Sequence, residues 1–219
     1  MTDRFAQTLG GASGILYVVL LMAGNGLGGP ASQLAFSLEV LAFTSFLFFL
    51  GSLWGAMCRA EGGGGLLSAT AFGAGVMSIT IKLASAAPVL AARANAGELD
   101  PNITGVLQDI NDASFALTFF PLAAMLAAVA LVAIRSAALP RWLGWAAAAL
   151  SVAFGVGGLV GTADLASDWA GLPMLIFMLW IFATSVVLIR RARAATTVAT
   201  VADGPRSSAP PSGRQMGLR

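Results

Sequence analysis

The chain contains no histidine and a single cysteine, Cys58, among its 219 residues. The lack of histidine excludes haem and zinc sites built on imidazole, and nucleophiles that an imidazole activates. One thiol can form neither an internal disulfide nor a Cys-x-x-Cys pair. The glycine run 62–65 lacks the Lys-Ser/Thr of a phosphate-binding loop. We therefore predict no metal, no cofactor and a protein that is not an enzyme.

Charge is also scarce. Only 10% of the residues are charged and 58% are hydrophobic, whereas a soluble domain carries roughly 25% charged residues. So few charges cannot cover a fold that faces water on all sides, and so apolar a chain is not disordered. The net charge of +2 does not indicate nucleic acid as a partner, because the basic residues lie at the ends of apolar runs. The composition predicts an integral membrane protein in contact with the lipid bilayer.

Six apolar stretches are long enough to cross a bilayer, whose hydrocarbon core of ~30 Å takes ~20 helical residues. Such spans are helices, because lipid offers no partner to an unpaired backbone group. We expect them at 11–30, 36–58, 66–91, 113–134, 141–162 and 172–190. The predicted fold class is all-α, a polytopic six-helix transmembrane bundle over residues 1–193. Residues 194–219 are rich in Ser, Pro, Gly, Ala and Thr, and are expected to form a disordered cytoplasmic tail.

The arginines predict the orientation of these spans. Six spans place on one side Arg4, Arg59, Arg135, Arg141, Arg190, Arg191 and Arg193. The other side holds Arg93 and most of the carboxylates. The positive-inside rule then places both termini in the cytoplasm. The excess of Arg over Lys is typical of the codon bias of high-GC bacteria, so we expect the membrane to be a bacterial inner membrane. An alternative remains, in which residues 1–31 are a cleaved signal peptide and five spans follow.

The third connection is the only long one and predicts a short amphipathic helix over 101–112 on the outer side. Asp100 is the expected N-cap and Pro101 the first helical residue. Ile103, Val106 and Ile110 then recur at helical spacing. The segment forms a lid over the outer end of the bundle, or it runs straight into the fourth span.

Glycines at four-residue spacing predict close helix packing through small-xxx-small faces, where dispersion supplies the attraction between helices. The pairs are Gly10–Gly14, Gly24–Gly28, Gly51–Gly55 and Gly157–Gly161. These faces serve packing within one bundle, or association with a second copy or a partner protein. The second span is rich in phenylalanine between Phe36 and Phe49, and we expect that aromatic face to contact lipid.

Two ionisable residues lie inside the spans, Glu39 and Lys82. At 1.5 Å per residue both lie roughly 5 Å below the outer face of the core, which makes an ion pair between them reasonable. Asn25, Asp109 and Asp112 are expected at the same level and complete a predicted outward-facing vestibule. Three plainer interpretations stay open: Lys82 reaching the headgroups, Glu39 favoured by a helix dipole, or a structural pair without ligand.

Two short elements carry a resemblance to known proteins. They are the segment 139–145, LPRWLGW, and the segment 107–113, LQDINDA, followed by FFPL at 119–122. Both resemble elements of actinobacterial multi-pass membrane proteins of unknown function. The resemblance implies an inner-membrane protein of six or seven helices and carries over no catalytic residues.

These observations favour a non-enzymatic membrane protein that binds or transports a small solute or ion through the vestibule. A second interpretation is an accessory or sensory subunit that docks a partner through its glycine faces. A third is an intramembrane enzyme that acts on lipid through Asp109, Asp112 or Asp164.

Overall fold

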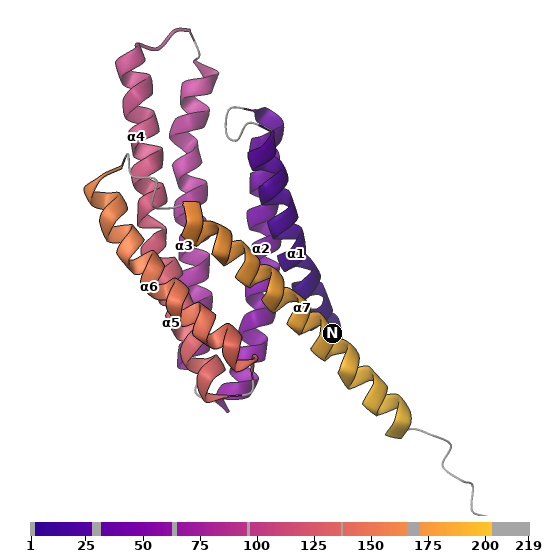
Figure 1. The fold of residues 1–219 in the computed structure, drawn as a ribbon. Coiled ribbons are helices and arrows are strands. Elements are labelled where there is room, and N and C mark those ends of the chain that lie inside the picture. The colour runs from indigo at the N-terminus through magenta and orange to yellow at the C-terminus, as the bar shows by residue number, and fades with distance from the viewer. Residues whose placement is uncertain are drawn as a thin grey trace, which may run out of the picture.

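The computed structural model describes residues 3–27, 32–62, 65–95, 97–136, 138–165 and 171–202, and they form seven α-helices (Figure 1). The helices are α1 (Asp3–Gly26), α2 (Gln33–Glu61), α3 (Leu66–Ala94), α4 (Pro101–Leu117), α5 (Phe119–Arg135), α6 (Arg141–Ala163) and α7 (Gly171–Ala202). Six helical stretches are long and apolar enough to cross a membrane, with α4 and α5 together forming the fourth. The predicted all-α, six-span class is confirmed.

The two terminal helices are longer than predicted at their outer limits. The first helix begins at Asp3 rather than near residue 11. The last continues to Ala202, so residues 194–202, which we expected to be disordered, are helical. This segment contains neither Gly nor Pro, and a helix that is already formed can be extended through it because each added residue gains a backbone hydrogen bond without a new nucleation cost. The rest of the predicted tail, 203–219, lies outside the described residues.

The third connection runs into the fourth span and forms no lid. The Asp100 side chain accepts a hydrogen bond from the Asn102 backbone N–H at 2.7 Å, so the predicted N-cap is confirmed. The helix α4 continues toward α5 with a break at Thr118 only. Pro121 explains the break, because it has no N–H to donate and its ring would clash with the carbonyl four residues earlier.

The helices run up and down between two ends of the bundle (Figure 1). The N-terminus and the α2–α3 and α5–α6 connections lie at one end, which we call the arginine end because Arg59 and Arg135 occupy the last turns of α2 and α5 there. The C-terminal ends of α1, α3 and α6 lie toward the opposite end, which we call the acidic end because Glu39 of α2 and Asp100, the N-cap of α4, lie near it. The helix α1 packs against α2 and α7, and α5 packs against α3 and α6.

Small residues permit the closest of these contacts. A Cβ atom at Gly10 would collide with Ser52, and one at Gly14 with Ser185 and Phe49. Gly24 faces the Ala35 carbonyl, Gly161 faces Ala116, and Gly157 is buried in α6. A Cβ atom added at Gly51 would have no atom of a side chain or of another helix within 4 Å. One added at Gly55 would meet only the Arg59 side chain, at 3.6 Å. The face of Gly51 and Gly55 is therefore open, while Gly28 lies outside the described residues.

The core contains the aromatic rings that we expected to face lipid. Phe46 and Phe49 of α2 are buried, and Phe46 packs edge-on against Phe177 with 6.2 Å between ring centroids. The expectation for this part of α2 was wrong, although Phe48 is exposed. A helix that is apolar on all sides shows no preferred inner face by composition, so its packing partners decide which rings are buried.

Candidate functional site

A cavity of about 290 Å³ opens into the bundle at the acidic end, and every helix except α6 contributes to its wall. Its polar lining residues are Tyr17, Asn25, Glu39, Ser78, Lys82, Asn111, Asp112 and Thr118. Its floor and sides are apolar and include Phe43, Phe46, Phe177, Leu122 and Met178. The cavity thus combines an apolar body with polar groups that come from four different helices, α1 to α4.

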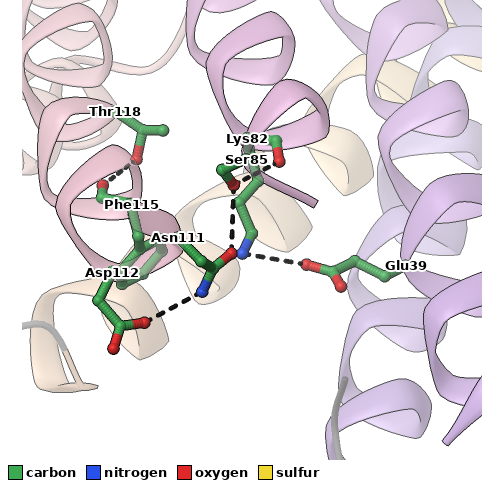
Figure 2. A network of polar contacts seen from close by, with 7 residues as sticks. All are labelled: Glu39, Lys82, Ser85, Asn111, Asp112, Phe115 and Thr118. Atoms are coloured by element: carbon green, nitrogen blue, oxygen red, sulfur yellow. Dashed lines mark hydrogen bonds and ion pairs between the residues drawn. The ribbon is translucent and has the colours of Figure 1, made fainter. Parts of the chain in front are cut away.

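The predicted ion pair between α2 and α3 is present in this cavity. The Lys82 Nζ lies 3.6 Å from Glu39 Oε1, and each side chain is 23% exposed. Lys82 Nζ also lies 5.2 Å from the centroid of the Phe115 ring, which places a positive charge over an aromatic face. The Lys82 side chain therefore points toward a carboxylate of the neighbouring helix (Figure 2).

A short chain of hydrogen bonds joins α3 to α4 beside this pair (Figure 2). Ser85 Oγ donates to the Lys82 carbonyl at 2.8 Å and lies 3.3 Å from Asn111 Oδ1. Asn111 Nδ2 donates to Asp112 Oδ1 at 3.0 Å. These contacts orient the Asn111 amide, and in the view of Figure 2 Lys82 and Asn111 lie between Glu39 and Asp112.

Asp112 differs from Glu39 in its partners. It accepts the hydrogen bond from Asn111, and among the described residues no cation lies within 4.0 Å of it, whereas Lys82 pairs with Glu39. Asp112 lines the cavity and is exposed at its mouth. The cavity therefore contains a carboxylate that no described cation neutralises at close range.

Aromatic rings form the deep wall of the cavity. Tyr17, the only tyrosine of the chain, is buried and lies 4.8 Å from Phe46 between ring centroids. Phe43 lies 6.3 Å from Tyr17, and Phe46 contacts Phe177 of α7. The sequence analysis missed this wall. Its signal was present, because Glu39, Phe43 and Phe46 recur at i, i+4 and i+7 and so share one face of α2.

Four of the five residues predicted for the vestibule meet in the cavity: Asn25, Glu39, Lys82 and Asp112. Asp109 does not, because it is exposed and absent from the lining. It lies one helical turn, ~4.5 Å, nearer the acidic end than Asp112, about 60° around the helix axis from Asp112 and about 160° from Asn111 at 100° per residue. The spacing of residues shows which of them share a face of a helix, but it does not show which face is turned toward a cavity. Asp164, the C-cap of α6, is likewise not part of the lining.

The cavity does not continue to the opposite end of the bundle. One to two turns further along α2 and α7 from the lining residues Phe46 and Phe177, toward the arginine end, Phe49, Leu53 and Ile181 are at most 2% exposed and belong to the apolar core. A second hollow, of about 430 Å³, lies beyond them at the arginine end, where Arg59 and Arg191 contribute to its lining. The two hollows are therefore separated by packed apolar side chains.

Within the described ranges, no three His, Cys, Asp or Glu side chains gather as they would around a metal ion. What the arrangement can do is hold a small molecule against aromatic rings, with one ion pair and one further carboxylate at its polar end. No family model, no curated protein and no solved structure matches the chain, so the site is interpreted from its own geometry.

Proposed function

We propose that this integral membrane protein binds a small solute in the cavity at the acidic end, as a receptor or as one step of transport. The observation that carries the proposal is the Glu39–Lys82 pair inside an aromatic-lined cavity of about 290 Å³. Ionisable groups within membrane spans are costly, and they usually mark a path or a site for a ligand. The volume suits a small molecule, since cavities for drug-sized ligands measure ~300–1,000 Å³.

The same proposal includes the orientation of the protein. The arginine end faces the cytoplasm of a bacterial inner membrane, in accordance with the positive-inside rule. The cavity then opens toward the outside and captures its solute from there. The packed layer around Phe49 and Leu53 favours binding or alternating access over a continuous pore, because conduction needs a lining that is open along its whole length.

The experiment is to fill the cavity from its mouth. Asn25 lines the cavity and is exposed, so the Asn25→Trp variant adds an indole ring there with little strain on the core. Three probes share one branched body and differ in charge: choline, 3,3-dimethylbutan-1-ol and 3,3-dimethylbutanoate. We expect at least one of them to bind the purified protein in nanodiscs and to lose that binding in Asn25→Trp.

The matched control is Asp109→Trp, which adds the same ring to an exposed position outside the cavity. Its binding should equal that of the unchanged protein. If no probe binds, or if both tryptophan variants bind as the unchanged protein does, the cavity is not a solute site and the proposal is wrong.

A second candidate function, docking of a partner protein, is favoured by one observation. In the described part of the chain the other small-xxx-small faces are used within the bundle, whereas Gly51 and Gly55 leave an open face on α2. Such a face permits close approach of another transmembrane helix. Gly51→Leu should abolish crosslinking to a partner or to a second copy if that face serves docking, and should leave binding of the probes unchanged.

A further inference from the structure

We infer that the solute is a small organic cation, an ammonium group on an apolar body, and that Asp112 is the residue that recognises its charge. This inference rests on the proposed function, because it names the ligand class of the same cavity. It goes beyond that function by predicting which of several equally sized solutes the cavity prefers.

The charges of the cavity lining are unbalanced. Two carboxylates, Glu39 and Asp112, line it together with a single ammonium group, that of Lys82. Lys82 is 3.6 Å from Glu39, so this pair neutralises itself. Asp112 accepts a hydrogen bond from the Asn111 amide and forms no ion pair with any residue that the structure describes. The lining as described therefore has one negative charge in excess, located at the mouth of the cavity.

The aromatic wall suits a cation as well. Ammonium groups are attracted to ring faces at centroid distances within about 6 Å, and aromatic cages are a common means of binding quaternary ammonium ligands. Phe115 already shows this contact with a side chain of the protein, since Lys82 Nζ lies 5.2 Å from its centroid. Phe115 is one turn from Asp112 on α4 and lines the same cavity. The carboxylate and the ring together offer a charged and a polarisable contact to one ammonium group.

Other ligand classes fit less well. An anion would have Lys82 as its only cation, and Lys82 is held by Glu39. A bare metal ion needs several oxygen ligands in place of its water shell, and no three acidic, histidine or cysteine side chains gather in the described part of the chain. A neutral solute would leave the Asp112 carboxylate without a cation to pair with. An organic cation satisfies the carboxylate and the rings at once.

The test compares choline with 3,3-dimethylbutan-1-ol, its neutral counterpart, and with 3,3-dimethylbutanoate, its anionic one. Binding to the full chain in nanodiscs is measured by calorimetry for the unchanged protein, Asp112→Asn and Asp109→Asn. We expect choline to bind most tightly. We expect Asp112→Asn to weaken choline binding about tenfold, because the Coulombic attraction between the quaternary ammonium and the carboxylate is lost, and to leave the neutral alcohol within twofold. Asp109→Asn, on the same helix but outside the cavity, should match the unchanged protein for all three probes.

The outcomes separate the ligand class from the function. Equal binding of the three probes, a preference for the anion, or a choline affinity that Asp112→Asn leaves unchanged would overturn the inference, while the cavity would remain a solute site. Loss of binding of all three probes in Asp112→Asn would indicate a misshapen cavity. In that case the Asp112→Glu variant distinguishes loss of the charge from loss of the cavity's shape. It keeps the charge and should restore the preference for choline if the inference is right. Absence of any binding to the unchanged protein contradicts the proposed function itself.

Discussion

The two ends of the bundle are both hollow, but their charges are arranged differently. At the arginine end the described lining of the hollow includes Arg59 and Arg191 and no carboxylate. Arg191 donates a hydrogen bond to the Ala138 carbonyl, so the partial negative charge of a backbone oxygen stabilises its guanidinium group. At the acidic end, carboxylates and an ammonium group from three helices face one another across a cavity with an aromatic wall.

This difference indicates which end needs a functional explanation. Arginines at helix C-termini are favoured by the helix dipole, and arginines on the cytoplasmic side are favoured during membrane insertion. In the proposed orientation, topology and folding therefore account for the arginine end. They do not account for the acidic end, because a partly buried ion pair recovers little more than its cost of desolvation. The ligand proposed above would account for the Glu39–Lys82 pair, whereas a gain in stability would not.

The largest effect is expected from a test of which end faces the cytoplasm. In a Cys58→Ser background, Glu98→Cys places a thiol in the exposed α3–α4 connection, and Ala194→Cys places one on the exposed part of α7 beyond the arginine end. A membrane-impermeant maleimide should label the first in intact cells and the second only after lysis. The reverse pattern would invert the proposed orientation and turn the cavity toward the cytoplasm.

A large effect on stability is expected where α1 packs between α2 and α7. In Gly10→Ala the new methyl group meets the Ser52 Cβ atom, which cannot move away without moving the backbone of α2. We expect the free energy of unfolding in detergent to fall by about 1–3 kcal/mol, the cost of overpacking. Denaturation followed by circular dichroism measures the change.

The control for that variant is Gly51→Ala, since no atom lies within 4 Å of the added methyl group there. Alanine stabilises an open helix position by roughly 0.5–1 kcal/mol relative to glycine. The two substitutions should therefore change stability in opposite directions. Equal changes would mean that the contact between α1 and α2 is looser than the structure shows.

Hydropathy alone was sufficient to predict the fold class and all six spans, because lipid imposes one solution on each long apolar stretch. Depth arithmetic was sufficient to bring Glu39 and Lys82 to the same level. It failed for Asp109, because a small rotation of a helix decides which side chains reach a cavity and depth contains no information on rotation. It also gave no hint that Tyr17 and Phe177, far apart in the sequence, would form one wall.

A moderate effect is expected from the ion pair, measured by a double-mutant cycle with Glu39→Gln and Lys82→Met. The two side chains are half-buried and 3.6 Å apart, so we expect a coupling free energy of about 1 kcal/mol toward unfolding in detergent. The same cycle on choline binding sharpens the comparison of the two ends. If the pair serves the ligand, its coupling should be larger in binding than in stability, and a coupling near zero in both would mean that the pair is incidental.

The smallest effect is expected at the arginine end, where Glu61 caps α3 from the last position of α2. Its carboxylate accepts hydrogen bonds from the Leu67 N–H at 3.1 Å and the Ser68 N–H at 2.8 Å, and a further one from the Ser68 hydroxyl. The residue before α3 is Gly65, which has no side chain to supply this cap. Glu61→Gln keeps one acceptor oxygen and removes the charge, so the unfolding temperature should fall slightly, by less than in Gly10→Ala.

The matched control is Glu98→Gln, which changes an exposed carboxylate in the α3–α4 connection and should leave the unfolding temperature unchanged. Probe binding should be the same in both variants, because the cap lies at the end of the bundle opposite the cavity, and altered binding in Glu61→Gln would show that the two ends are coupled.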